Sequence, residues 1–229
     1  MKNILLLVLP FSLCAQTFNI TNITVPAYER YLLRDLNGGQ TMALEINSVN
    51  DKRFGPSWSV NAVTTFPEMK NEASMIIRHA DLQVVSAAET RTFKDGTVRE
   101  TFELKSLTAT NDDKGFLVSN PQSIGYIMRT FPFTSGERQI TLRFLGSRGG
   151  GMSFYVKNNG LKRIDLKTLG RIDAYELELG VDASLLSAFI PKTFYYFRND
   201  VQKTFVRFKG SFMPGAKEND LELVEYTNR

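Results

Sequence analysis

The sequence predicts a mainly β, single-domain fold, either an antiparallel sandwich or a partly open barrel, with one or two short helices. Short apolar segments alternate with turn signals along most of the chain, and helical patterns are few. In the clearest case, Tyr175, Leu177 and Leu179 alternate with Glu176 and Glu178, which is the period of a strand with one dry face. Because the connections are too short for parallel crossovers, we expect antiparallel pairing.

The N-terminus has the pattern of a secretory signal peptide. Lys2 provides a positive charge, Ile4–Leu13 is almost entirely apolar, and Ala15 ends a small-residue cleavage site. The apolar run is shorter than the roughly 20 residues of a membrane span. We therefore predict a signal peptide at residues 1–15 and one β-rich domain at residues 16–229, exported to the periplasm or the extracellular space.

Cys14, the only cysteine, is either removed with the signal peptide or kept as a lipidated first residue. A lipoprotein signal places a small residue before its cysteine, whereas Leu13 is large, so cleavage after Ala15 is favoured. The mature chain then has neither a thiol nor a disulfide. Its basic residues are scattered rather than gathered in a stripe, so we predict no nucleic-acid partner.

The expected strands follow one another along the chain, and the Asp95-Gly96 turn marks a hairpin because both residues tolerate positive φ. In the segment from Thr204, the alternation places Val206 and Phe208 on one face and Phe205 and Arg207 on the other. The predicted strands are Thr41–Ile46, Trp58–Thr64, Met75–His79, Leu82–Val85, Thr90–Phe93, Val98–Leu104, Ile140–Leu145, Met152–Val156, Ala174–Leu179, Thr193–Phe197, Thr204–Phe208 and Leu221–Tyr226.

Two segments carry helical signals. Asn120-Pro121 is a capping pair for a helix that runs through Ile124 and ends before Pro132. Asp182–Phe189 is the second candidate, and Pro191 stops it.

The single histidine, His79, restricts the enzyme classes that the chain can belong to. A serine-histidine triad would need His79 as its base, and no GxSxG elbow accompanies it. Neither a histidine-rich metal site nor an HExxH motif is present. We therefore predict no metal, no cofactor and no catalytic residue, and we expect His79 to be a strand or edge residue.

Carboxylate chemistry stays open as an alternative. Glu176 and Glu178 share a strand face and suit acid–base work, although a solvent-facing strand has the same pattern. Asp112-Asp113 is typical of a solvated turn. The glycine-rich segment 146–151 lacks the ending of a phosphate loop and is interpreted as a hairpin loop.

Aromatic residues suggest where a ligand would bind. Four consecutive aromatic residues begin at Phe194, and alternate members of a strand point to opposite faces. We predict an apolar or amphipathic ligand, with Met128, Phe131 and Phe133 acting as a lid or a packing element. The residues predicted to line the site are Tyr195, Tyr196, Phe197, Phe205 and Phe208.

The leading functional hypothesis is a non-enzymatic binding or carrier module of the cell envelope with no transmembrane span. The first alternative is a structural protein that binds another envelope protein through a sheet edge or an exposed apolar patch. The second is a secreted hydrolase that uses a carboxylate pair, one of which would need a raised pKa.

Overall fold

The computed structural model describes 13 strands and two short helices. The strands are β1 Tyr28–Asp35, β2 Thr41–Asp51, β3 Gly55–Thr65, β4 Met69–Arg78, β5 Val84–Phe93, β6 Val98–Arg99, β7 Phe116–Val118, β8 Gln139–Leu145, β9 Gly151–Leu166, β10 Gly170–Val181, β11 Thr193–Arg198, β12 Phe205–Gly210 and β13 Asn219–Asn228. The helices are the 3-10 turn Ile20–Asn22 and α1, Ile124–Arg129. The described residues are 18–99, 116–118, 123–134, 136, 138–145, 151–181, 192–211 and 218–229.

All of these strands belong to one sheet with the order β6-β5-β4-β3-β2-β1-β13-β12-β11-β10-β9-β8-β7. Consecutive strands pair in antiparallel fashion, and β13 joins the two halves by pairing with both β1 and β12. The exception is β7, which pairs with β8 in parallel. Since β6 and β7 lie at opposite ends of the order, the sheet is not closed into a barrel.

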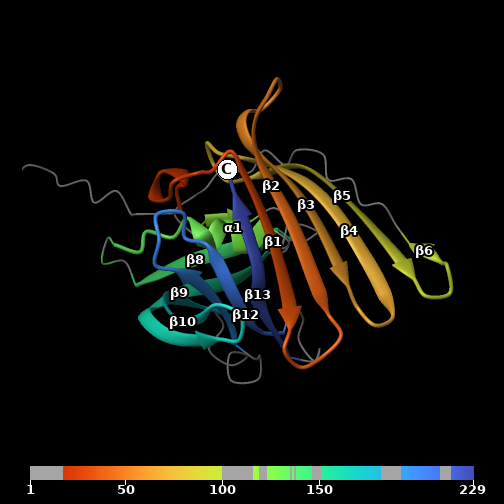
Figure 1. The fold of residues 1–229 in the computed structure, drawn as a ribbon. Coiled ribbons are helices and arrows are strands. Elements are labelled where there is room, and N and C mark those ends of the chain that lie inside the picture. The colour runs from red at the N-terminus through yellow and green to blue at the C-terminus, as the bar shows by residue number, and fades with distance from the viewer. Residues whose placement is uncertain are drawn as a thin grey trace, which may run out of the picture.

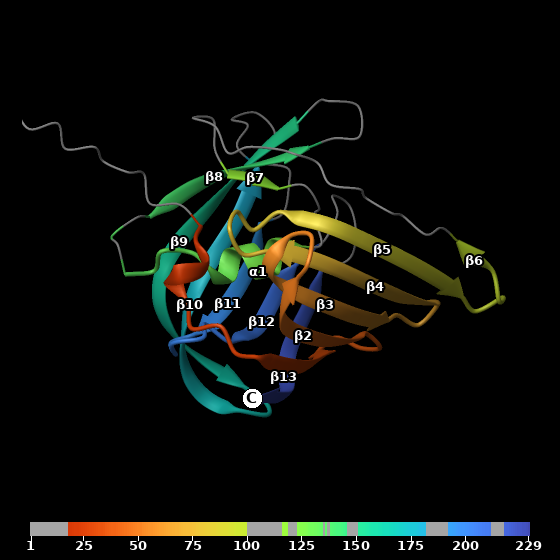
Figure 2. The same cartoon turned by 90° about the horizontal axis from the view of Figure 1, so that it is seen from above.

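The sheet curves strongly around α1 (Figures 1 and 2). One wall consists of β8 to β12, and β1 to β6 form the other, with α1 inside the curve. The strands β3 to β6 extend outward beyond α1, and we call them the arm (Figure 2). The fold is therefore a partly open barrel, as the sequence predicts.

Alternation sets which side chains face the inside of the curve. Along β1, Glu29, Tyr31, Leu33 and Asp35 are buried, whereas Arg30 and Arg34 are exposed. The same alternation in the other strands places the core inside the curve, where it packs around Ile127 of α1.

The predicted strands fall in or beside observed ones, except that residues 100–104 of Val98–Leu104 lie outside the described residues, and Leu82–Val85 and Thr90–Phe93 both overlap the single strand β5. The Asp95-Gly96 hairpin is confirmed, with Gly96 at φ +81°. Strand β1 was not expected, and β9 continues to Leu166 instead of ending at Val156. The predicted helix beginning near Asn120-Pro121 corresponds to α1. The signal peptide, Asp112-Asp113, most of the glycine-rich segment and Asp182–Phe189 lie outside the described residues.

Candidate functional site

The aromatic residues predicted to line a ligand site lie mainly in the core. Tyr195, Phe197 and Phe208 are buried on the inside of the curve. The half-buried ring of Phe205 lies 5.6 Å from that of Phe197, although the alternation had placed Phe205 on the face opposite Phe208. The register shifts between Tyr196 and Phe197, and this irregularity interrupts the strict alternation there. Tyr196 is half-buried.

The segment from α1 to Phe133 covers this aromatic cluster. A Cβ on Gly125 would lie only 3.9 Å from the Tyr195 ring, so α1 packs closely on β11. The Phe133 ring lies 6.1 Å from Phe197 and 4.6 Å from Tyr175. Met128 and Phe131 are fully buried. In this structure Met128, Phe131 and Phe133 pack over the aromatic cluster.

A buried ion pair fixes α1 inside the curve. Arg129 donates two parallel hydrogen bonds to Glu29 of β1, at 2.6 Å and 2.9 Å. Its Nε donates to the carbonyl of Gln202 at 2.6 Å. The Glu29 carboxylate also accepts from the hydroxyls of Tyr31 and Tyr226, each at 2.8 Å. We call these five residues the buried ion-pair network.

The two phenols of this network stay protonated at neutral pH. Burial raises the pKa of the Tyr31 phenol well above its usual value, and burial with the nearby Glu29 raises the pKa of Tyr226 to about 12. Both phenols therefore remain donors to Glu29 at neutral pH. Since α1 has only six residues and is too short to be stable alone, these contacts and the core hold it in place.

On the inner face of the arm, residues that lie opposite one another on neighbouring strands form rows across the sheet. These rows change from apolar to polar towards the tip. Val60 pairs with Met75, and Met75 pairs with Ala87, so the first row is apolar. The next row pairs Ala62 with Ala73, and Ala73 with Glu89. On this face Met75, Ala73 and Thr64 are buried, whereas Ala62 is half-buried.

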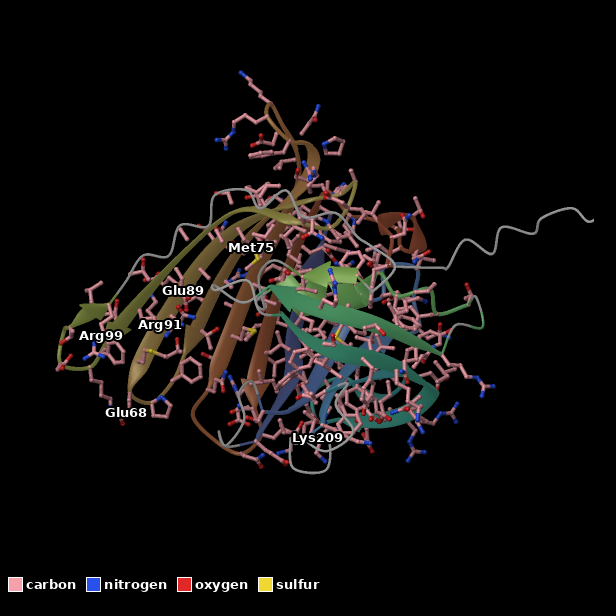
Figure 3. All side chains as sticks on the ribbon, turned by 180° about the vertical axis from the view of Figure 1, so that it is seen from behind. Glu68, Met75, Glu89, Arg91, Arg99 and Lys209 are labelled. Carbon is pink, nitrogen blue, oxygen red and sulfur yellow. The ribbon has the colours of Figure 1, made fainter. Side chains whose placement is uncertain are left out.

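The row nearer the tip is polar. It pairs Thr64 with Asn71, Asn71 with Arg91, and Arg91 with Arg99. Figure 3 shows Met75, Glu89, Arg91 and Arg99 in succession along this face. Among the described elements, α1 is the helix inside the curve, and it packs on β11, so the inner face of the arm extends beyond it (Figure 2).

The chain resembles two solved structures in outline. No family model and no curated protein matches it. It is similar to a β-barrel-like protein with a domain of unknown function, DUF1849, from Brucella abortus, with a TM-score of 0.49, 7% identity, and coverage of 90% of this chain and 99% of that chain. It is also similar to the hypothetical lipoprotein YmcC from Escherichia coli, with a TM-score of 0.33, 7% identity, and coverage of 90% and 89%. At these values the two structures indicate nothing about what this chain binds.

His79 lies directly after β4, and its ring packs edge-on against Trp58 with the centroids 5.1 Å apart. Burial lowers the pKa of His79 below its ordinary value of 6.5. His79 Nε2 and Trp58 Nε1 have no hydrogen-bond partner within the part of the chain that the structure describes. The pair therefore provides a spectroscopic reporter at the inner end of the arm, since each is the only residue of its type.

We expect Trp58 fluorescence to fall as the pH drops below 6.5, because an imidazolium in contact with an indole quenches its emission. The folded protein should also lose stability in this range, because His79 binds a proton more readily in the unfolded chain than in the folded one. The contribution of neutral His79 to the free energy of unfolding is therefore present above pH 6.5 and is lost below it. A fluorescence titration of the wild type and of His79→Gln from pH 8 to 4 measures this. A transition that survives in His79→Gln would contradict the assignment.

The carboxylate pair considered for acid–base chemistry lies within a hydrogen-bonded cluster. Asn159 donates to Glu176 at 2.9 Å and to Glu178 at 3.3 Å. Glu178 also accepts from Tyr155 and pairs with Lys192, both at 2.8 Å. Burial raises the pKa of Glu178, but these three donors outweigh it and hold the pKa below its usual value. Glu178 therefore lacks the raised pKa that the hydrolase hypothesis requires of a general acid.

Two features are absent from the residues that the structure describes. In those ranges, no three His, Cys, Asp or Glu side chains gather into a group that could hold a metal ion. No helix there has the length and apolar character needed to cross a membrane.

Sequence reasoning missed the residues that position α1 and those at the tip of the arm. Glu29 lies on the same strand face as Tyr31 and Leu33, and a carboxylate on the same face as two apolar residues is a signal for a buried, paired charge. Arg129, at the end of the predicted helix, is its partner. The signal for Arg91 and Arg99 is the Asp95-Gly96 hairpin itself, because the two arginines flank that turn and pair across it.

Proposed function

We propose that the protein is an exported, non-enzymatic binding or carrier module of the cell envelope that holds an apolar or amphipathic ligand against the inner face of its open sheet. Export rests on the signal-peptide pattern of residues 1–15. The observation that carries the binding function is the inner face of the arm, which continues the apolar core outward beyond α1. An apolar face of this kind favours a ligand that covers it.

The proposed ligand site lies on the arm and not on the aromatic strands β11 and β12. Tyr195, Phe197 and Phe208 are packed under α1 and Phe133, so a ligand there would have to displace the core. On the arm, Ala62 is half-buried, so this face is partly accessible there, whereas Ala73 beside it is buried. A ligand there would contact apolar carbon without disturbing the buried ion-pair network.

The structural alternative is less well supported. It requires an exposed apolar patch, and the most exposed large apolar residues of the described chain come from different strands and turns. These residues are Val98 in β6, Leu161 in β9, Leu169 between β9 and β10, and Val201 between β11 and β12.

Placing a phenyl ring on the inner face of the arm should block binding. We expect Ala62→Phe to weaken the binding of dodecanol, a neutral apolar probe, by about tenfold or more, which corresponds to about 1.4 kcal/mol. The matched control is Asn61→Phe, since Asn61 is the exposed neighbour on the opposite face of β3. The measurement is Trp58 emission of residues 16–229 during titration with dodecanol.

The two variants separate binding on this face from nonspecific association. The account predicts a saturable change in emission for the wild type and for Asn61→Phe, with a weaker response for Ala62→Phe. A linear, non-saturating response in the wild type, or equal affinities for the two variants, would contradict a binding site on the arm.

A further inference from the structure

The tip of the inner face has more positive than negative charge. Arg91 of β5 lies directly opposite Arg99 of β6, on the same face of the arm. Glu89 accepts a hydrogen bond from Arg91 Nε at 2.8 Å, and the Glu89 side chain is only 14% exposed. Arg99 lies over the Phe93 ring, 5.4 Å from its centroid. Of the two guanidinium groups, Arg91 therefore has a carboxylate partner, and Arg99 lies on an aromatic ring.

Two like charges directly opposite each other destabilise a strand pair. The strand pair β5–β6 carries this arrangement at the end of the sheet, where a third charge of opposite sign would relieve it. Arginine is the side chain best suited to such an anion, because its planar group donates two parallel hydrogen bonds to a carboxylate or a phosphate.

A third polar group, Asn71 of β4, lies opposite Arg91 in the same row. Its buried Oδ1 atom has no hydrogen-bond partner among the residues that the structure describes. That oxygen is an acceptor and does not bind an anion, but the Nδ2 group of the same amide is a donor that suits an acidic head group. An acidic head group between Arg91 and Arg99 would lie beside this amide.

We infer that the ligand of the arm is an amphipathic anion, a single acidic head group on an apolar tail. The head group pairs with Arg91 and Arg99 beside Asn71, and the tail lies along the alanine row towards Met75. From Ala87 to Arg91 the strand advances four residues, or about 13 Å, which sets the length of tail that the face accommodates. This inference rests on the proposed function, because it specifies the ligand of the same face.

The test compares dodecanoate with dodecanol, which has the same tail and no charge, and with acetate, which has the head group alone. Trp58 emission and titration calorimetry follow binding to residues 16–229, with dodecanoate kept below its micelle concentration. We expect dodecanoate to bind more tightly than dodecanol, and acetate to show no saturable binding.

The deciding variant is Arg91→Gln/Arg99→Gln. We expect about a tenfold or greater loss of dodecanoate affinity and no change for dodecanol. The matched control is Lys70→Gln/Lys94→Gln, which removes the same charge from exposed positions of the arm and should bind dodecanoate like the wild type. The melting temperatures of both double variants are measured to show that they fold, since the arginine variant removes the Arg91–Glu89 ion pair together with the opposed charges.

The outcomes separate this inference from the proposed function. Equal binding of dodecanoate and dodecanol, with no effect of the arginine variant, would overturn the inference and leave an apolar binding face. Acetate binding as tightly as dodecanoate would overturn the role of the tail. If neither long-chain probe binds, the proposed function itself fails.

Discussion

Replacing Arg129 with Met is expected to lower the free energy of unfolding by about 3–5 kcal/mol, because it leaves a buried carboxylate without its charge partner. Arg129 and Glu29 are 3% and 1% exposed, and Arg129 also satisfies the Gln202 carbonyl. The pair joins α1 to β1 and to the turn after β11, which are far apart in sequence. Urea unfolding followed by circular dichroism measures the loss.

Two controls identify the buried charge as the cause. The double variant Glu29→Met/Arg129→Met should be more stable than Arg129→Met, since no unpaired charge remains. Removing the exposed ion pair of β9 and β10 with Arg163→Met should cost less than about 1 kcal/mol, because that arginine is 69% exposed. A loss below 1 kcal/mol in Arg129→Met would show that the network does not hold α1 in place.

Truncating Phe131 to Ala should cost about 3–5 kcal/mol of unfolding free energy. Its side chain is fully buried, and its ring lies 5.8 Å from Phe18 and 5.4 Å from Phe133. The substitution opens a cavity between the N-terminal segment and the end of α1. Thermal and urea unfolding of the variant measure the cost.

The matched control for this truncation is Phe54→Ala. Phe54 is half-buried beside the β2–β3 turn, where its ring contacts Arg53, so its loss opens no cavity in the core. It should cost clearly less than Phe131→Ala. Equal costs for the two variants would mean that the segment after α1 is not a structural part of the core.

The sequence was informative about strands because alternation is a local signal. Tyr175, Leu177 and Leu179 show it directly, and the Asp95-Gly96 turn fixes one hairpin by backbone chemistry alone. The open curved sheet follows from many short antiparallel connections. Strand β1 was overlooked because Glu29 and Asp35 break its apolar face, although both are buried.

The binding face depends on contacts between residues distant in sequence. The predicted aromatic residues are covered because α1 packs on β11, about 70 residues away along the chain, and no local pattern specifies that packing. Similarly, the ring of Phe205 joins the cluster through a register shift that strict alternation does not foresee. The parallel pairing of β7 with β8 is also set by the tertiary structure.

The central claim is that the open sheet carries an apolar or amphipathic ligand on the inner face of its arm. Native mass spectrometry of residues 16–229, purified without detergent from a host that exports the protein, tests this most directly. The account predicts a discrete additional mass that disappears on denaturation and is absent from Ala62→Phe. A wild-type protein with only its bare monomer mass, or an additional mass retained by Ala62→Phe, would contradict it.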